Sequence, residues 1–280
     1  MHGKVCVITG GNSGIGRAMA EQIGALGTNV VIVCRNAEKG RETIEHLRRM
    51  IGADRFALVV ADLSLRDEIR RAAGEILLRH PKVHVLINNA GVYLPRRRLT
   101  AEGFEAMFAT NHLGPFLLTD ALMDALMAAA PARVITVSSE GHRLGHIDLT
   151  DLQAERHFSG LKQYCNTKLA NILFTRELSR RFHARGISAN AFHPGSVRSG
   201  FAQDERGAFG LMVRLIAPFL RTPERGARTG TLLATAEDGA QTTGTYFADG
   251  RPKKPAPEAL QDGLAARLWE ETARLAGVEA

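Results

Sequence analysis

The sequence predicts an α/β fold in which a doubly wound parallel sheet forms a single domain. Short apolar runs rich in β-branched residues alternate with longer amphipathic stretches along the first two thirds of the chain. The runs are apolar almost throughout, as is typical of strands buried on both faces of a parallel sheet. A glycine-rich turn joins the first run to the first amphipathic stretch. Together these observations favour a Rossmann-type sheet covered by helices on both sides.

Six apolar runs are the expected strands of this sheet. They are Lys4–Thr9, Asn29–Cys34, Phe56–Val60, Val83–Asn88, Arg133–Ser138 and Ile187–Phe192. The expected helices between the first four runs are Ile15–Leu26, Ala37–Met50 and Ser64–Arg79. Parallel strands connected through helices require right-handed crossovers.

The last third of the chain has a different pattern but continues the same domain, which we expect to span residues 1–280. Glycine mixes with apolar residues over about 199–222, and this segment is expected to cover the substrate as a lid. The alternative is that its side chains simply pack on the sheet. A helix is expected from about Pro223, with proline at its favoured first position. A strand at Thr245–Ala248 and a terminal helix over about 258–276 complete the prediction.

Composition limits the classes of partner. Of the 280 residues, 45% are hydrophobic and 23% charged, as in ordinary globular proteins. The formal net charge of +7 favours anionic partners, which include nucleotide cofactors and nucleic acids. Only 6% of residues are aromatic, and no basic stretch is interleaved with aromatic residues. The stacking surface of a single-strand binder is therefore missing, and we expect no nucleic-acid partner.

Cysteine and histidine usage argues against disulfides and metals. The three cysteines are too few and too scattered for a disulfide framework, so a reduced, cytoplasmic location is expected. The histidines lack metal-ligand spacing, and we expect no metal. No apolar run approaches the length of a membrane span. The first apolar run begins at Val5 and leaves no room for a signal peptide, so none is expected.

The glycine-rich turn is the first candidate binding site. Glycines let the backbone turn sharply and approach a pyrophosphate without Cβ clashes. The N-terminus of the following helix favours negative charge. The residues expected to bind the cofactor here are Gly10, Asn12, Ser13, Gly14, Ile15 and Gly16. The alternative is a tight connection with no ligand.

The end of the second run predicts which nicotinamide cofactor binds. NAD enzymes place an acidic residue about 20 positions beyond the glycines, whereas a nearby arginine suits the 2′-phosphate of NADP. Here Arg35 and Asn36 end the run, and the first acidic residue is Glu38 in the next helix. A guanidinium can bind the phosphate through two hydrogen bonds. We therefore expect NADP(H), although Arg35 could also be an ordinary surface arginine.

A second signal lies at Tyr164 and Lys168. Apolar residues at helical spacing follow them, so the two side chains are i, i+4 neighbours on one helix face. A free tyrosine has a pKa near ~10 and is a poor base at neutral pH. An adjacent ammonium is expected to lower that pKa and so allow proton transfer. A Tyr-x-x-x-Lys pair alone occurs by chance in many helices.

Taken together, the motifs resemble those of the short-chain dehydrogenase/reductase family in its compact single-domain branch. The matching segments are Thr9–Gly16, Asp62-Leu63, Asn88-Asn89-Ala90-Gly91, Asn111, Ser138-Ser139, Tyr164 with Lys168, and Pro194-Gly195. The resemblance covers nearly the whole chain.

The resemblance implies a role for each matching residue. Tyr164 is the catalytic acid or base, and Lys168 holds the nicotinamide ribose and lowers the tyrosine pKa. Ser139, rather than Ser138, bonds the substrate oxygen, and Asn111 holds a water in a proton relay. Further cofactor contacts are implied for Asp62, Leu63, Asn88, Ala90, Gly91, Pro194, Gly195, Val197 and Ser199. Helix capping and turn formation are the alternative interpretations of several of these residues.

Sequence segments outside the shared motifs are similar to those of retinol dehydrogenases and the related WW-domain oxidoreductases. The similar segments are Val33–Asn36, Thr110–Gly114, Lys168–Phe174 and His193–Gly195. Thr167 departs from the serine usual in that group, and Ser199 replaces a threonine common in the wider family. The implied substrate is a lipophilic carbonyl compound or alcohol, such as a retinal-like or a medium- or long-chain aldehyde or ketone.

The resulting hypothesis is an NADP(H)-dependent oxidoreductase that transfers hydride between nicotinamide and a carbonyl or alcohol substrate. The alternatives are a reductase of small polar ketones, a nucleotide-sugar epimerase and a non-catalytic NADP-sensing regulator. Pairing through the tyrosine helix, as in family members, would give a homodimer or homotetramer. The run Arg96–Arg98 is interpreted as a solvated loop, with steering of an anionic substrate as the alternative.

Overall fold

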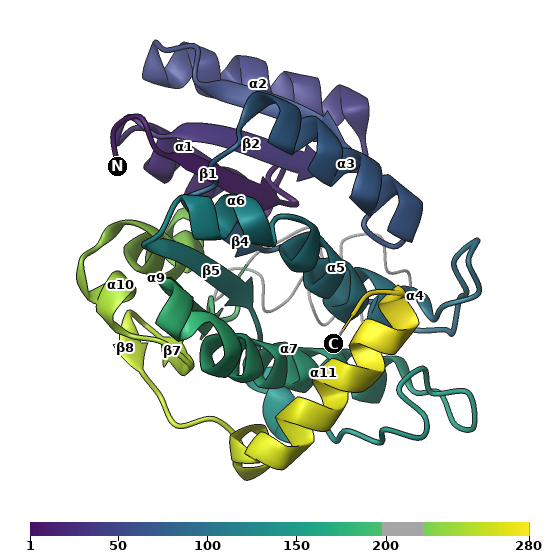
Figure 1. The fold of residues 1–280 in the computed structure, drawn as a ribbon. Coiled ribbons are helices and arrows are strands. Elements are labelled where there is room, and N and C mark those ends of the chain that lie inside the picture. Colours follow the sequence, from purple (N-terminus) through teal and green to yellow (C-terminus); the bar gives the residue numbers. More distant parts are fainter. Residues whose placement is uncertain (198–220, 280) are drawn as a thin grey trace.

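One mainly parallel sheet forms the centre of the computed structural model, which describes residues 1–197 and 221–279 (Figure 1). Its strand order is β3-β2-β1-β4-β5-β6-β7-β8, and only β8 is antiparallel to its neighbour. The strands are β1 Val5–Thr9, β2 Asn29–Cys34, β3 Phe56–Val60, β4 Val85–Asn88, β5 Ala132–Val137, β6 Ile187–His193, β7 Thr245–Ala248 and β8 Arg251–Pro252. The predicted α/β fold with a doubly wound parallel sheet is confirmed.

Helices cover both faces of the sheet (Figure 1). They are α1 Gly14–Gly24, α2 Ala37–Ile51, α3 Arg66–Arg79, α4 Ala106–Phe108, α5 Gly114–Ala121, α6 Met123–Ala128, α7 Gly160–Phe182, α9 Pro223–Thr235, α10 Asp238–Gln241 and α11 Asp262–Ala276. Helix α1 packs against α2 and α9 on one face. Helices α3, α5, α7 and α11 contact one another on the other.

Alternation along β1 directs its side chains into two apolar cores on opposite faces of the sheet. Val5 and Val7 of β1 point into the core beneath α3, α5 and α7. Their neighbours Cys6 and Ile8 point into the core beneath α1 and α9. Because successive side chains of a strand face opposite sides, a strand covered on both faces must be apolar throughout. This requirement explains why the apolar runs were informative in the sequence.

The crevice of the sheet lies beside β1, where the strand order reverses. Strand β1 pairs with β2 on one side and with β4 on the other, and Val7 lies between Val31 and Leu86. Connections from these strands leave in opposite directions at their carboxyl ends. In open α/β sheets, ligands bind in the crevice that this divergence opens.

Helix α11 lies across the outer face of α7 (Figure 1). Its Trp269 is 4.7 Å from the ring of Phe116 on α5 and 5.7 Å from that of Phe174 on α7, between centroids. The Trp269 and Phe174 rings are nearly parallel, at 11°. The expected terminal helix over about 258–276 therefore exists but begins at Asp262, because Pro257–Leu260 forms a separate 3₁₀ turn.

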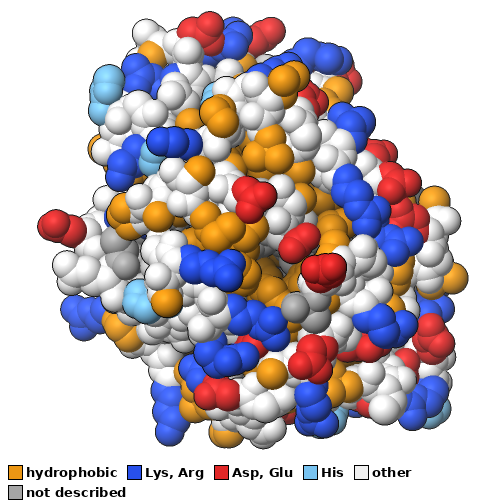
Figure 2. Space-filling view, in the orientation of Figure 1, with side chains coloured by type: hydrophobic (Ala, Val, Ile, Leu, Met, Phe, Trp, Pro, Cys, Tyr) orange, Lys and Arg blue, Asp and Glu red, His pale blue; other side chains and the backbone are white. Residues whose placement is uncertain are grey.

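Charges of both signs intermingle on the face viewed in Figure 1. Figure 2 shows Lys and Arg side chains mixed with Asp and Glu around an apolar hollow near the centre of this face. The net charge of +7 is therefore not gathered into a basic stripe on this side. In residues 1–197 and 221–279, no helix has both the length and the apolar character that a bilayer crossing requires.

Candidate active site

The glycine turn between β1 and α1 is a tightly packed piece of backbone. Gly10 and Gly14 have φ angles of +64° and +50°, which residues with a Cβ rarely adopt. A Cβ on Gly16 would lie 2.3 Å from the carbonyl oxygen of Gly10 and 2.6 Å from Nδ2 of Asn89. The turn can therefore take this shape only with glycine at these positions.

Asn89, whose motif implies no individual role for it, supports this turn from behind. Its Nδ2 donates to the carbonyl oxygens of Thr9 at 2.8 Å and of Gly10 at 3.3 Å. The backbone N–H groups of Asn89 and Ala90 both donate to Thr9 Oγ1, at 2.9 and 3.0 Å. The double asparagine at the end of β4 was the available signal, but only the packing shows which of the two contacts the turn.

The N-terminus of α1 faces the crevice. Ser13 precedes the helix in an extended conformation, and its exposed side chain makes no capping hydrogen bond within the described residues. The first helical N–H groups are therefore not capped by Ser13 and can bind an anion. The carbonyl oxygen of Asn12 accepts from Thr43 Oγ1 at 3.1 Å, which ties the turn to α2. This geometry fits a pyrophosphate.

Arg35 extends from the end of β2 with 75% of its side chain exposed, and its Nη1 is 3.6 Å from Oδ2 of Asp62. Oδ1 of Asp62 accepts from the backbone N–H and the hydroxyl of Ser64 at 2.9 and 2.7 Å. Asn36 instead caps α2, because its Oδ1 accepts from Lys39 N–H at 2.9 Å. Arg35 and Asp62 thus lie together at the crevice, while the Asn36 side chain has a structural partner.

Two other expected cofactor contacts point into the protein. The side chain of Asn88 is 2% exposed, and its Nδ2 donates to Thr119 Oγ1 on α5 at 3.0 Å. Leu63 is buried, and its carbonyl oxygen lies 2.3 Å from where a Cβ on Gly114 would be. The Asn88 side chain and the Leu63 backbone thus pack against α5, and neither side chain is free to contact a ligand in the crevice.

Tyr164 and Lys168 occupy successive turns of α7, as their spacing predicts. The Nζ atom of Lys168 lies 5.6 Å from the centroid of the tyrosine ring. It donates to the carbonyl oxygen of Val137, at the end of β5, at 3.1 Å. In the opposite direction, the hydroxyl of Ser138 donates to the carbonyl oxygen of Lys168 at 2.8 Å. These two hydrogen bonds fix α7 to the carboxyl end of β5.

Burial is the main influence on the pKa values of Tyr164 and Lys168. It raises the pKa of Tyr164 to about 12, and a hydrogen bond from Ser139 acts in the opposite direction. It also lowers the pKa of Lys168 to about 8. Desolvation of the phenolate is the largest influence on the tyrosine pKa here, and the lowering of that pKa by Lys168 stays a prediction. At neutral pH the phenol keeps its proton, which is the form that a general acid requires.

The two serines that follow β5 have different partners. Ser138 is buried and bonds the backbone of α7, whereas Ser139 is partly exposed and bonds Tyr164. The Ser139 hydroxyl also accepts from the backbone N–H of Gly141 at 3.2 Å. Ser139 is therefore the serine that lies beside the tyrosine hydroxyl.

Asn111 sits in a π-helical turn, Ala109–Leu113, a distortion that is frequent at functional sites. Its Oδ1 accepts from Val92 N–H at 2.7 Å, and its Nδ2 donates to the Val92 carbonyl at 2.9 Å. The same Nδ2 donates to Thr167 Oγ1 at 3.1 Å. Both Asn111 Oδ1 and Lys168 Nζ lie 3.4 Å from the position of a Cβ on Gly91. Asn111 thus joins the segment after β4 to α7 beside the lysine.

The chain after β6 turns back over the start of α1. Gly195 has φ +85°, and a Cβ there would lie 2.7 Å from Cδ of Arg221. A Cβ on Gly226 of α9 would lie 2.6 Å from Val197 Cγ2, 3.4 Å from Ile15 Cγ1 and 3.5 Å from the Pro194 carbonyl oxygen. Ile15, Pro194 and Val197, which are expected to contact the cofactor, therefore meet around Gly226. Ser199 and most of the expected lid, about 199–222, lie outside the described residues.

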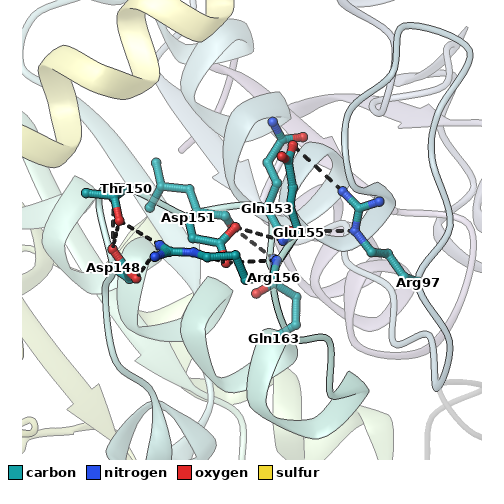
Figure 3. A network of polar contacts seen from close by, with 9 residues as sticks. Arg97, Asp148, Thr150, Asp151, Gln153, Glu155, Arg156 and Gln163 are labelled. Carbon is teal, nitrogen blue, oxygen red and sulfur yellow. Dashed lines mark hydrogen bonds and ion pairs between the residues drawn. The ribbon is translucent and has the colours of Figure 1, made fainter.

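A polar network ties the loops beside Tyr164 together (Figure 3). Arg97 donates to the Gln153 carbonyl at 3.3 Å, and its Nη2 is 3.9 Å from Glu155. Gln163, next to Tyr164, donates to the buried carboxylate of Glu105 at 3.0 Å. Figure 3 shows Arg97 directed toward these loop residues. Arg97 therefore belongs to a structural network, which explains one of the three arginines in its run.

The Tyr164 phenol, the Ser139 hydroxyl and the Lys168 ammonium group lie at the carboxyl ends of the strands, next to the glycine turn.

Comparison with known proteins agrees with this arrangement. The family model described as short chain dehydrogenase matches residues 4–208. Human retinol dehydrogenase 12 is 40% identical over 276 residues, which cover 99% of this chain and 87% of that protein. Human retinol dehydrogenase 13 is also 40% identical, with coverage of 99% and 86%.

Solved structures show the same fold. The crystal structure of a protein from Mycobacterium Paratuberculosis superimposes with a TM-score of 0.81 at 30% identity, covering 99% of this chain and 95% of that one. The Pseudomonas aeruginosa RhlG/NADP active-site complex superimposes with a TM-score of 0.72 at 25% identity, covering 89% and 96%. The family model and the relatives span most of the chain, and the chain therefore belongs to the short-chain dehydrogenase/reductase family of oxidoreductases.

Proposed function

We propose that this protein is an NADP(H)-dependent oxidoreductase that transfers hydride between nicotinamide and a lipophilic carbonyl compound or alcohol. The observation that carries the proposal is the grouping of Tyr164, Ser139 and Lys168 beside the glycine turn. When bound, the cofactor supplies the hydride chemistry. The protein supplies the position of the substrate and the path of the proton.

In the reductive direction, the substrate oxygen accepts a hydrogen bond from Ser139 and receives the proton of the Tyr164 hydroxyl. The raised pKa of Tyr164, about 12, keeps that proton available. Lys168, which donates to the Val137 carbonyl, would bind the nicotinamide ribose and stabilise the tyrosinate after transfer. In oxidation the same residues act in reverse, with Tyr164 as the base. Asn111 joins Val92 to Thr167 on α7, and its part in a proton path toward Lys168 stays a prediction.

Arg35 supports the choice of NADP(H) over NAD(H). Replacing Arg35 with alanine should weaken the binding of NADPH far more than the binding of NADH. Hydrogen bonds to charged groups contribute roughly 1.5–3 kcal/mol, or about one to two orders of magnitude in affinity. The measurement is the Kd of each cofactor by fluorescence titration. Arg49→Ala, an exposed arginine in the last turn of α2, is the matched control and should change neither value. A wild type that prefers NADH, or an unchanged preference in Arg35→Ala, would exclude this assignment.

The names of the similar proteins support a lipophilic substrate. They are called retinol dehydrogenases, and retinol is a lipophilic alcohol. With NADPH, kcat/KM should rise with the chain length of straight-chain aldehydes before levelling off. Each buried methylene contributes about 0.8 kcal/mol, which is roughly fourfold per carbon. A flat series, or a preference for short polar ketones, would contradict the lipophilic substrate. NADPH binding without turnover of any carbonyl compound or alcohol would favour the sensing regulator instead.

A homo-oligomer and a cytoplasmic location are the two remaining parts of the proposal. The predicted homodimer or homotetramer would pair through α7, yet α11 of the same chain already covers much of that helix. Any pairing through this face would therefore have to use α11 or displace it. The cytoplasmic location likewise stays a prediction, based on the small number of cysteines.

A further inference from the structure

His142 bridges the candidate catalytic serine and a distant segment of the chain. It lies in the 3₁₀ turn Glu140–Leu144, which directly follows Ser139, and its side chain is 0% exposed. Its Nδ1 is 2.7 Å from the carbonyl oxygen of Ser139. Its Nε2 is 3.0 Å from the backbone N–H of Ala256, 114 residues farther along the chain. Neither the sequence motifs nor the proposed mechanism gives this residue a role.

The two contacts determine the tautomer of the ring. A backbone N–H can only donate, so Nε2 must be the unprotonated, accepting nitrogen. The carbonyl of Ser139 can only accept, so Nδ1 must carry the proton. The neutral Nδ1–H imidazole therefore satisfies both neighbours at once, whereas the other tautomer would satisfy neither. The ring of Tyr246, 4.8 Å away between centroids and inclined at 61°, holds the imidazole in this plane.

The turn that carries His142 is held on several sides. Glu140 accepts from the hydroxyl of Tyr246 at 3.1 Å and from Nζ of Lys253 at 3.3 Å. Arg143 donates to the Lys254 carbonyl at 2.8 Å. A Cβ on Gly141 would lie 3.5 Å from Ser139 Oγ and 3.9 Å from Cε1 of Tyr164. A shift of the turn would therefore move the serine hydroxyl relative to the tyrosine.

We propose that His142 is a positioning residue, which fixes Ser139 against Tyr164 by donating from Nδ1 to the serine carbonyl while Ala256 fixes the ring. This inference rests on the role proposed above for Ser139. Besides the Nδ1 contact, the Ser139 carbonyl accepts only from the backbone N–H of His142 at 3.1 Å among the described contacts. The side chain thus connects the serine carbonyl directly to the segment after β8, which Glu140 and Arg143 contact without touching that carbonyl.

Two matched variants separate the two hydrogen bonds. In His142→Asn, the amide nitrogen takes the position of Nδ1 and keeps the bond to Ser139. In His142→Gln, the amide oxygen reaches toward the position of Nε2 and keeps the bond to Ala256. Each variant loses one bond, so their stabilities should be similar. We expect His142→Asn to keep kcat within about threefold of wild type and His142→Gln to lose about tenfold or more, because small misplacements of reacting groups are costly.

The Kd for NADPH should stay unchanged in both variants, since neither touches the glycine turn. In a Ser139→Ala background, His142→Gln should lower kcat by less than about twofold, because residues that act through one another are not additive. Equal losses in the two histidine variants, or additive losses with Ser139→Ala, would overturn the proposal. Wild-type activity of Ser139→Ala itself would instead refute the role of the serine.

A measurement on the unmodified protein remains decisive should a variant fail to fold. Nitrogen chemical shifts of ¹⁵N-histidine-labelled protein at neutral pH report which ring nitrogen is protonated. The expected result for His142 is protonation at Nδ1 alone. A ring protonated at Nε2 could not accept from Ala256, and that result would rule out the proposed bridge.

Discussion

Tyr164→Phe should lower kcat by ~10²–10⁴ or more, which is the contribution of a general acid or base. The phenyl ring keeps its packing on α7 and its edge-to-face contact with Tyr93, at 6.1 Å between ring centroids. What is lost is the proton that burial holds on the hydroxyl at neutral pH. The rate of hydride transfer should be followed by the absorbance of the reduced cofactor under single-turnover conditions.

The same variant contains its own control. The phenol does not take part in the glycine turn, so the Kd for NADPH and the melting temperature should stay close to those of the wild type. A loss of cofactor binding together with turnover would mean that the substitution damaged the fold. Turnover at the normal rate would show that another group supplies the proton and would remove Tyr164 from the mechanism.

Gly16→Ala should have the largest effect on cofactor binding. The added Cβ would lie 2.3 Å from the Gly10 carbonyl oxygen and 2.6 Å from Nδ2 of Asn89, so the turn must move. If two backbone N–H bonds to the pyrophosphate are lost at about 1.5–3 kcal/mol each, NADPH binding weakens roughly 10²–10⁴-fold. Overpacking of this kind also destabilises a fold by about 1–3 kcal/mol. Calorimetric titration and urea unfolding measure the two effects separately.

Gly74→Ala is the matched control for this substitution. Gly74 lies inside α3, and a Cβ there meets nothing within 4 Å. The change should stabilise the protein by about 0.5–1 kcal/mol, since glycine is less favourable than alanine inside a helix. NADPH affinity should not change. Normal NADPH binding by Gly16→Ala would show that the cofactor does not contact the turn.

The strands were predictable because burial on both faces leaves a continuous apolar signature. The ranges Asn29–Cys34, Phe56–Val60 and Thr245–Ala248 agree with β2, β3 and β7. Strand β4 begins two residues later than expected, at Val85, and the N–H of Val83 donates to the Ala125 carbonyl instead.

Elements decided by contacts distant in sequence were harder to predict. The 3₁₀ turn before α11 separates because the Glu258 carboxylate accepts from the N–H of Ile147 at 2.8 Å. Strand β8 follows Asp249-Gly250, both with positive φ, and an Asp-Gly pair is a hairpin signal that is present in the sequence.

The same distinction applies to the site. Tyr164 and Lys168 share a helix, so their spacing alone brings them together. Asn89 and His142 act through backbone groups of distant segments, and no spacing rule relates a side chain to a carbonyl 80 residues away. The tyrosine pKa also depends on burial, which a motif does not contain.

The packing of α11 has a consequence for how the chain is made. This helix follows every strand of the sheet in the sequence, yet its Trp269 covers Phe116 and Phe174. During synthesis, the ribosome completes all the strands before the residues that shield these rings have emerged. Until Trp269 has emerged and α11 has docked, Phe116 and Phe174 lack this cover, so a sheet that forms earlier exposes an aromatic surface to water. Such surfaces are the usual targets of chaperones and a common origin of aggregation.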